Sequence, residues 1–441
     1  MKQAPRSHAR RGFAMLVVLG VIMITAFVLV VVQTSALGQA ASGRESLARV
    51  RAYWAARAGI ESTIARLEYD TQNPNQTDGY AVFTDLSEVS QDTLQGAQYS
   101  IFTSAGKSVF DGPTDSNAKI NINTATRDQL LLIEPFMTED VADSVLDWID
   151  SDDDVREVGA ELGYYQSMTY AYKPRNAPMQ SIQELELVAG TDPLDVRGED
   201  WNLNGVLDDN ENDGDVSWPP DNADGILDAG WSGVLTAATS SASMYGASGD
   251  LRVDLSSGDS ATLISRTQVS AAQADIIVAY AANAPEAKMS DFIRLRFSQI
   301  AQAAGQNNAQ APELTVEQLG ALLNECAIGV PDPATPGKIN INTCDQKIFE
   351  YIPQINSTVA DTLITERAAK STGFASMAEL LEIQGISRTT AATLYDLFDV
   401  VTTGFEVTSR GKDVNTGIEV EISATIDRSS LPIVIKELYA R

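Results

Sequence analysis

The fold is decided near the amino terminus, where residues 13–32 read FAMLVVLGVIMITAFVLVVV. At about 1.5 Å of rise per residue, a helix of this uncharged stretch is about 30 Å long, which is the thickness of a bilayer core. Four basic residues precede this stretch, namely Lys2, Arg6, Arg10 and Arg11, and no acidic residue does. By the positive-inside rule, the short end stays in the cytoplasm and the rest of the chain lies outside.

A helical pattern continues beyond this stretch, which favours a retained anchor over a cleaved secretory signal. Apolar residues recur about three or four positions apart at Leu47, Val50, Trp54, Ala58, Ile60, Ile64 and Leu67. A cleaved signal usually has a shorter apolar core and a small-x-small cleavage site beyond it. We predict one amino-terminal helix over residues 13–70, of which about 13–33 cross the membrane.

Composition and charge argue against several classes of protein. The 441 residues include Lys+Arg 31 and Asp+Glu 60, and the net charge of −29 repels phosphate backbones. The single histidine, His8, lies near the start, and two cysteines cannot build a four-cysteine zinc site. An envelope enzyme would need a nucleophile–base pair, and the sequence offers none. We predict a binding or structural protein and not an enzyme.

A six-residue motif, KININT, occurs at residues 119–124 and again at 338–343. Each copy indicates a short extended piece that leads into a capped helix. The apolar residues that follow predict a helix, a turn that contains Pro135 or Pro353, and a second helix. The sequence therefore predicts two helix-hairpin-helix parts, over residues 119–191 and 337–399.

Such hairpins either bind phosphate through backbone N–H groups or pack within the protein. The turn Gly385-Ile386-Ser387 has only Arg388 as a nearby base, and Asp396 and Asp399 follow it. A phosphate there would meet like charge at short range. We therefore predict a packing role and no nucleic-acid partner.

Between the hairpins, residues 200–211 read DWNLNGVLDDNE and match the twelve-residue calcium loop at every ligand position. The expected oxygen ligands are Asp200, Asn202, Asn204, the Val206 carbonyl, Asp208 and bidentate Glu211, with Gly205 at the sharp turn. The alternative is a solvated polar turn. We predict Ca²⁺ as the cofactor of this region, residues 192–231.

A second run in the same region matches the calcium loop only in part. Its middle positions are Asn222, Asp224, Ile226 and Asp228, but Pro220 stands first and Trp231 last. A second ion would need completion by another carboxylate, for which Asp213 and Asp215 are the candidates.

Cys326 and Cys344 flank the second KININT motif, and in an oxidising compartment a disulfide is favoured over a reactive thiol.

The two ends of the chain predict one more module. Strands are expected near residues 98–103 and over 400–407, 417–427 and 431–438, with turns at 410–412 and 428–430. Residues 71–118 and 400–441 would form an antiparallel sheet on the outer half of the amino-terminal helix, and residues 232–336 an inserted variable region. The predicted class is α+β, with a large α-domain inserted into the sheet.

The dipeptide Gly12-Phe13, between a basic leader (residues 1–12) and the apolar helix, resembles the site cut by prepilin peptidases, whose product begins with a methylated Phe. Most pilins have Glu at the fifth mature position, which here is Val17. In the type IV pilin superfamily that absence is typical of the K-type minor pseudopilins of type II secretion systems, also called general secretion pathway protein K. The stretches that resemble the K-type α-domain are 147–150 (DWID), 159–161 (GAE), 164–165 (YY), 172–178 (YKPRNAP) and 184–190 (ELELVAG).

This resemblance implies a type IV pilin-like fold and a function in protein secretion. The implied protein is a single-pass inner-membrane subunit with a periplasmic carboxy-terminal domain. It would sit at the tip of the pseudopilus, where it initiates or caps assembly for the export of folded proteins. Its implied partners are the I- and J-type minor pseudopilins, the major pseudopilin and the prepilin peptidase. The alternative is a membrane-anchored DNA receptor of the competence type, whose hairpins begin similarly.

Overall fold

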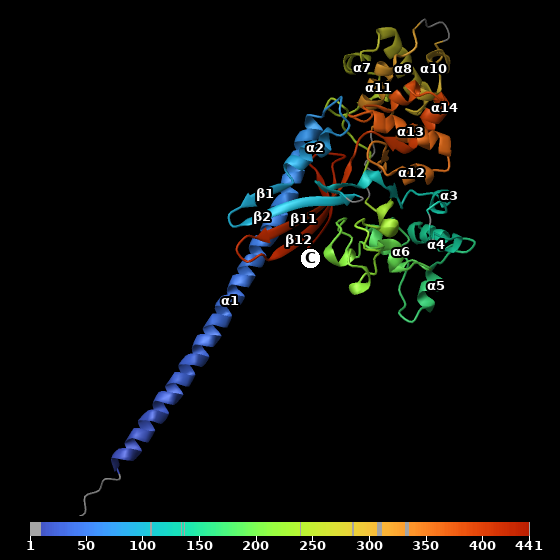
Figure 1. Cartoon of the computed structure of the whole chain (residues 1–441). Coiled ribbons are helices and arrows are strands. Elements are labelled where there is room, and N and C mark those ends of the chain that lie inside the picture. Colours follow the sequence, from blue (N-terminus) through green and yellow to red (C-terminus); the bar gives the residue numbers. More distant parts are fainter. Residues whose placement is uncertain are drawn as a thin grey trace, which may run out of the picture.

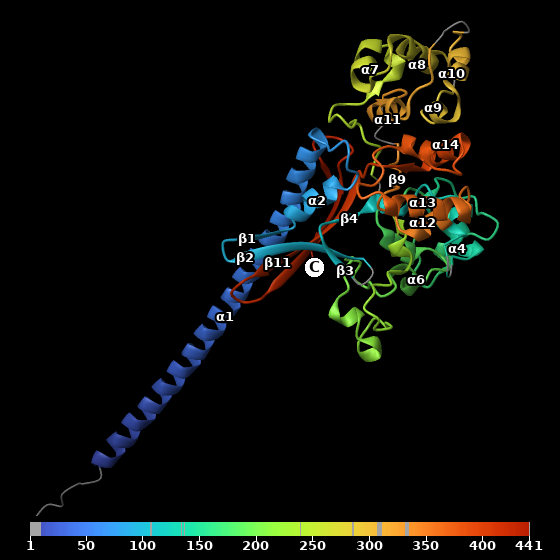
Figure 2. The same ribbon diagram turned by 45° about the horizontal axis from the view of Figure 1, so that its top comes forward.

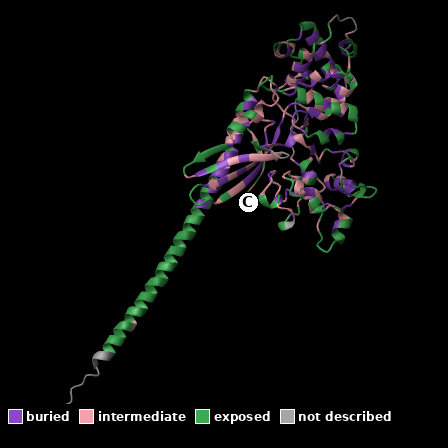
Figure 3. Ribbon diagram, viewed as in Figure 1, coloured by how far each residue is buried: buried purple, intermediate pink, exposed green. Residues whose placement is uncertain are grey.

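The computed structural model describes residues 10–440 except 106–107, 134, 136, 239, 285, 307–310 and 331–334. Most of the predicted leader, with His8, lies outside the described residues. Helix α1 (Arg10–Gln72) runs from the lower left of Figure 1 up along the sheet. Among the described helices it is the one long and apolar enough to span a membrane, and its apolar window touches no other part of the chain. Figure 3 shows the amino-terminal half of α1 exposed, as expected for a segment that lipid or other subunits cover.

The outer half of α1 packs on a seven-stranded antiparallel sheet, which confirms the predicted α+β class. The order along the sheet is β1-β2-β11-β12-β13, with β3 beside β2 and β4 beside β11. The strands are β1 (Gln91–Leu94), β2 (Ala97–Ala105), β3 (Ser108–Asp111), β4 (Thr114–Asp115), β11 (Gly404–Asp413), β12 (Glu419–Asp427) and β13 (Val434–Ala440). Helix α2 (Ala81–Glu88) connects α1 to the sheet.

Small residues bring α1 and the sheet into close contact. One of them, Gly411, lies in a strand where the sequence had predicted a turn. Residues 410–412 lie inside β11, and the chain turns only after Asp413, at Gly417 with φ +73°. Gly411 faces α1 so closely that a Cβ there would overlap the carbonyl oxygen of Ala52. The glycine marks a close approach of two backbones and not a turn.

Gly411→Val is therefore expected to destabilise the protein by about 1–3 kcal/mol, because the added side chain pushes α1 off the sheet. The measurement is the thermal unfolding midpoint of the full chain in detergent. Gly163→Ala is the matched control, since a Cβ at Gly163 meets nothing within 4 Å. Equal midpoints for Gly411→Val and the unchanged protein would contradict this account of the interface.

The segment between β4 and β11 forms the α-domain, which lies beside the sheet and extends past the outer end of α1 in both views (Figures 1 and 2). A single buried apolar cluster runs through it from Ile120 to Val400, whereas α1 and the sheet share a separate cluster. The α-domain is joined to the sheet by Asn117, whose Oδ1 accepts from the backbone N–H groups of Thr403 (3.0 Å) and Gly404 (2.8 Å).

The two KININT motifs have the same structure. Each forms a two-residue strand in a parallel pair: β5 (Ile120–Asn121) with β6 (Leu235–Thr236), and β9 (Ile339–Asn340) with β10 (Phe398–Asp399). The side chain of Asn123 bonds both backbone groups of Met179, at 2.9 and 2.7 Å. Asn342 bonds Phe374 in the same way, at 3.0 and 2.8 Å. The repeated asparagine thus fixes a later segment by its backbone.

Helix pairs follow both motifs, which confirms the predicted hairpins. In the first copy they are α3 (Arg127–Leu130), α4 (Glu139–Ile149), the 3₁₀ helix η2 (Ile182–Leu187) and α6 (Pro193–Arg197). In the second they are α12 (Gln346–Glu350), α13 (Ser357–Ala369), η7 (Met377–Glu382) and α14 (Arg388–Leu397). The first copy differs by two long insertions, one with α5 (Leu162–Ser167) and one over residues 198–233.

A third group of helices makes up most of the predicted variable region. Its ends meet in a parallel pair of β7 (Val253–Asp254) and β8 (Cys326–Ala327). The helices between them are α7 (Ser260–Thr267), α8 (Ala271–Asn283), α9 (Asp291–Arg294), α10 (Phe297–Ala303) and α11 (Val316–Glu325). They contribute to the same buried cluster as the hairpins.

The predicted disulfide is absent from the structure. Cys326 and Cys344 are both free and buried, Cys326 in β8 and Cys344 just before α12. The Sγ of Cys344 instead contacts the carbonyl oxygen of Ile341 at 3.8 Å. Burial raises the pKa of each thiol to about 12, so both stay protonated at neutral pH and are poor nucleophiles.

Candidate functional site

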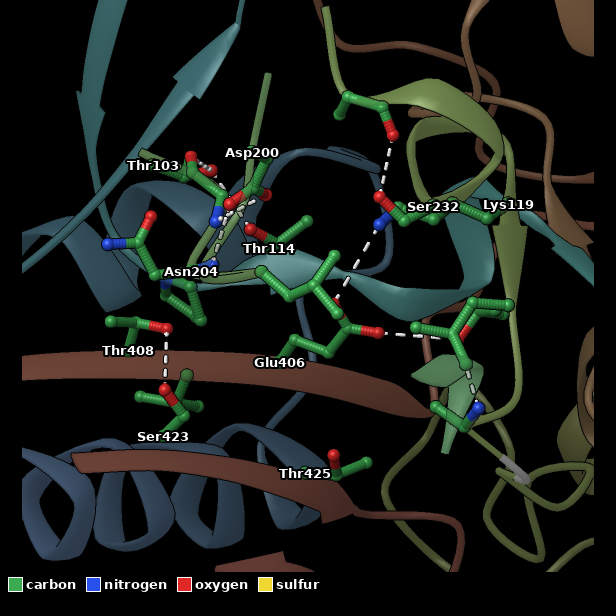
Figure 4. Close-up of a pocket in the computed structure, with 18 of the residues that line it drawn as sticks. Thr103, Thr114, Lys119, Asp200, Asn204, Ser232, Glu406, Thr408, Ser423 and Thr425 are labelled. Atoms are coloured by element: carbon green, nitrogen blue, oxygen red, sulfur yellow. Dashed lines mark hydrogen bonds and ion pairs between the residues drawn. The ribbon is translucent and has the colours of Figure 1, made fainter. Parts of the chain in front are cut away.

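The predicted calcium loop lies against the face of the sheet that α1 leaves uncovered (Figure 4). The carbonyl of Gly205 accepts from the N–H of Ser104 in β2 at 2.8 Å, and the hydroxyl of Ser104 accepts from the N–H of Leu207 at 3.0 Å. Gly205 has φ +71°, so glycine suits the sharp turn. The loop therefore connects the α-domain to the sheet.

The structure brings the predicted ligands together around one loop. The carboxylate of Asp200 accepts from the backbone N–H groups of Asn204 (2.9 Å) and Gly205 (3.0 Å). The carboxylate of Glu211 accepts from those of Trp201 (3.0 Å) and Asp208 (3.1 Å). The side chains at the first and last predicted ligand positions, Asp200 and Glu211, thus both accept hydrogen bonds from the backbone of the loop between them.

Asp208 is the centre of the polar contacts in this loop. The side-chain amides of Asn202 and Asn204 donate to its Oδ2 at 2.9 and 3.0 Å. Its Oδ1 lies 3.1 Å from Nη2 of Arg410 in β11, which also contacts Glu421 at 3.1 Å. This ion pair is a second connection between the loop and the sheet.

The electrostatics of the loop fit a hard cation. Glu211 is only 1% exposed. Burial first, and then the charges of Asp200 and Asp208, raise the pKa of Glu211 to about 7. Three carboxylates on one loop repel each other, and a bound cation with oxygen ligands would remove that repulsion. The residues present therefore fit Ca²⁺.

The second run adopts the same backbone turn, and Glu199 supplies the carboxylate that it lacks. Gly225 has φ +78°, close to that of Gly205. Glu199 accepts from the N–H groups of Asn222 (3.1 Å) and Asp228 (3.2 Å), much as Glu211 does in the first loop. Its carboxylate is buried, which raises its pKa.

Of the other predicted residues, Asn222 and Asp228 come together, since the amide of Asn222 donates to Asp228 at 3.2 Å. Asp224 and Ile226 are adjacent in the turn, where Asp224 accepts from the N–H of Ile226 at 2.7 Å. Asp213, a candidate to complete this loop, binds Ser217 instead, at 2.7 and 3.1 Å. Glu199 was missed because it precedes both loops in the chain and no linear spacing links it to the second.

A cavity of about 350 Å³ lies between the first loop and the sheet. Figure 4 shows hydroxyls on its walls, and these bond to each other: Thr103 to Thr114 at 2.9 Å, and Thr408 to Ser423 at 3.2 Å. None of the described residues around it forms a pair of nucleophile and base. Apolar side chains, among them Phe102, Leu203 and Leu235, line the rest of the cavity.

Arg388, the base next to the Gly385 hairpin turn, is committed to packing. It donates through Nη1 to the carbonyl oxygens of Ile293 (2.9 Å) and Leu295 (3.2 Å) in the third helix group. The Arg388 side chain therefore connects the hairpin turn, where a phosphate would bind, to the third helix group. This geometry agrees with the predicted packing role of the hairpins.

At the amino terminus, Gly12 and Phe13 lie in the first turns of α1. Val17 is half exposed on the apolar half of the helix. The first carboxylate after it is Glu45, which pairs with Arg49 at 3.0 Å and so belongs to the outer half. Residues 13–33, the predicted membrane-crossing part of α1, carry no charged side chain.

Comparisons with known proteins give two family matches. Residues 118–198 match the model of the first domain of type II secretion system protein K, and residues 336–398 match that of the helix-hairpin-helix motif. No curated protein matches the chain. Among solved structures, the chain is similar to one in the GspK-GspI-GspJ complex of the type 2 secretion system of enterotoxigenic Escherichia coli, with 13% identity and a TM-score of 0.47 over 91% of this chain and 99% of that one.

Proposed function

We propose that this chain, a K-type minor pseudopilin of the type II secretion system, forms the tip of the pseudopilus and there initiates or caps its assembly. The observation that carries this proposal is the position of the α-domain, which extends past the outer end of α1 (Figures 1 and 2). In a filament of stacked pilin-like subunits, a further subunit above this one would clash with that domain.

Val17 supports the same position. In pilins, the Glu at the fifth mature position is thought to neutralise the amino-terminal ammonium of an adjoining subunit inside the apolar helix bundle. An unpaired charge at that depth costs several kcal/mol, so the carboxylate matters wherever such a neighbour exists. Val17 cannot supply it. A subunit without the carboxylate can enter where no neighbour above requires it, which is the tip.

The proposal predicts about one copy of this protein per pseudopilus, which quantitative mass spectrometry of sheared and purified filaments would measure against the major pseudopilin. Val17→Glu restores the carboxylate but is expected to leave the copy number unchanged, because the α-domain still blocks the next subunit. Val17→Leu is the control for a change of side chain without charge. Copies repeated along the shaft, in either protein, would reject the tip position.

The proposed partners and location follow from the same assignment. The chain would be anchored in the inner membrane by α1, with its acidic part in the periplasm, and would bind the I- and J-type minor pseudopilins and the major pseudopilin. The prepilin peptidase would remove residues 1–12, and the new amino terminus at Phe13 would be methylated. Co-purification of the chain with I and J subunits tests the partnership.

We also propose that the chain works by assembly and not by catalysis, with Ca²⁺ as a structural cofactor. The first ion would bind Asp200, Asn202, Asn204, the Val206 carbonyl, Asp208 and Glu211. A second would bind the turn of Asn222, Asp224, Ile226 and Asp228, completed by Glu199. Extracellular calcium sites typically have dissociation constants of about 10⁻⁴–10⁻³ M, which suits the periplasm. The DNA receptor is not favoured, given the net charge of −29 and the bonds of Arg388.

A further inference from the structure

A cavity of about 430 Å³ lies where the outer end of α1 and helix α2 meet the α-domain. Figure 2 shows α2 beside that end of α1. The pilin-like part contributes residues from the segment 66–85 and Arg428, and the α-domain contributes residues from 243–252, 374–375 and 400–402. A ligand in this cavity would therefore contact both parts of the protein at once.

Arg428, which directly follows β12, has donors to spare in the wall of this cavity. Its Nε donates to the carbonyl oxygen of Thr402 at 2.8 Å, and its guanidinium carbon lies 5.5 Å from the centre of the Phe405 ring. Within the described residues neither Nη atom makes a hydrogen bond, and neither is sealed from solvent. The N–H groups of both Nη atoms are thus available to a ligand.

The carboxylates nearest in charge to Arg428 are committed to other partners. Asp70 pairs with Arg66 at 3.1 Å, and Asp115 accepts from the hydroxyl of Thr402 at 2.6 Å. Burial outweighs the attraction of these two charges and lowers the pKa of Arg428 to about 10, so the group is still charged at neutral pH. A partly buried charge without an ion pair is costly, and an incoming anion would remove that cost.

The other charges in the wall favour an anion with a single charge. Asp70, Asp78 and Asp85 line the same cavity, and Arg66 pairs with both Asp70 and Asp85. Arg252 is held by backbone carbonyl oxygens. A phosphate group, which carries close to two negative charges at pH 7, would be repelled by the three carboxylates more strongly than a carboxylate would.

Apolar side chains make up much of the remaining wall, namely Tyr69, Val82, Phe374, Val400 and Val401. A mainly apolar pocket with a few polar groups that fix orientation is typical of a ligand site, and this volume suits a ligand of one or two residues. The cavity therefore offers a basic anchor and an apolar surface side by side.

We propose that this cavity binds the carboxyl terminus of a polypeptide, with the terminal carboxylate on Arg428 and an apolar last side chain against the valines. The planar guanidinium matches the two oxygens of a carboxylate, and such a pair is stronger than a neutral hydrogen bond. The last residue of a chain carries a carboxylate and a side chain on the same carbon, which is the combination that the cavity offers. This inference does not depend on the proposed place at the tip.

The test uses the full chain in detergent and a tetrapeptide of three glycines and a final leucine, labelled with fluorescein at its amino end. Fluorescence anisotropy measures the binding. The peptide with a free carboxyl end is expected to bind at least tenfold more tightly than the same peptide with an amide end, because only the free end supplies the anion that Arg428 lacks.

Arg428→Met keeps an unbranched side chain and removes the charge, so it is expected to bind the two peptides equally. Arg49→Met is the matched control, since Arg49 is an exposed arginine of α1 outside the cavity, paired with Glu45. It is expected to keep the full preference for the free carboxyl end. If Arg428→Met fails to fold, Ala247→Trp serves in its place, because it narrows the cavity and leaves Arg428 untouched. It is expected to weaken binding of the free-acid peptide at least tenfold.

Three results would overturn the proposal. The first is equal binding of the two peptides to the unchanged protein. The second is an amide-ended peptide with an internal glutamate that binds as tightly as the free acid, which would assign the site to acidic side chains. The third is inorganic phosphate that displaces the labelled peptide at a lower concentration than acetate does, which would assign the site to phosphate.

Discussion

Gly12→Val is expected to leave the leader attached to nearly every copy of the protein. Gly12 immediately precedes the apolar helix and follows a basic leader. A peptidase that cuts between Gly12 and Phe13 must bring its catalytic groups close to this backbone, and the missing side chain permits that approach. A branched side chain at this position blocks it. The intact mass of the purified protein would show the added mass of residues 1–12 and no methyl group at Phe13.

Gly20→Val is the matched control for Gly12→Val. A Cβ at Gly20 meets nothing within 4 Å, and this glycine lies within the same helix beyond the cut. Its mature form is expected to begin at Phe13, as in the unchanged protein. The processing assignment would be wrong if Gly12→Val still began at Phe13, or if the unchanged protein were cut beyond Ala36.

Removal of calcium is expected to lower the thermal unfolding midpoint of the protein. Glu211→Gln should abolish most of the part of this decrease that the first calcium site contributes. With dissociation constants of about 10⁻⁴–10⁻³ M, 10 mM Ca²⁺ stabilises the fold by about 1.4–2.7 kcal/mol for each ion. Without the ion, Asp200, Asp208 and Glu211 repel each other. The bonds of the loop to Ser104 and Arg410 then weaken, so the α-domain loosens from the sheet.

Glu211 also predicts how the metal-free protein responds to pH. Its pKa in the folded protein is about 7, above the ordinary value of 4.5 for a glutamate side chain. Between these two values the folded state keeps a proton that the unfolded state has lost, so stability falls as pH rises. The stability that Glu211 lends the metal-free fold is present at pH 4 and lost by about pH 7. Glu211→Gln should remove this contribution to the slope.

The control for the calcium experiment is Asp209→Asn, since Asp209 is an exposed acid within the loop at a position that supplies no ligand. It is expected to respond to chelator as the unchanged protein does. A melting curve that does not change between chelator and calcium, at neutral pH, would favour the solvated polar turn instead.

Features that depend on neighbours in the sequence were predictable. The apolar run of α1, the paired KININT motifs with their hairpins and the turn at Gly205 all arise from local periodicity and local backbone preference. The predicted ligands between Asp200 and Glu211 come together because they belong to one short loop, whose side chains bond to its own backbone and to each other. The same local reasoning placed a turn at Arg410-Gly411-Lys412, because glycine beside charged residues is typical of turns.

Tertiary structure alone decided the features that join distant segments. Gly411 lies within β11 because α1 needs a residue without a Cβ at the place where the helix crosses the strand. Glu199 completes a loop more than twenty residues away, and Glu161 meets Asp147 across an insertion. Cys326 and Cys344 stay apart although they flank one motif. Local sequence sets backbone preferences over a few residues, whereas these contacts depend on how the elements pack, and packing places side chains by volume and charge and not by their order in the chain.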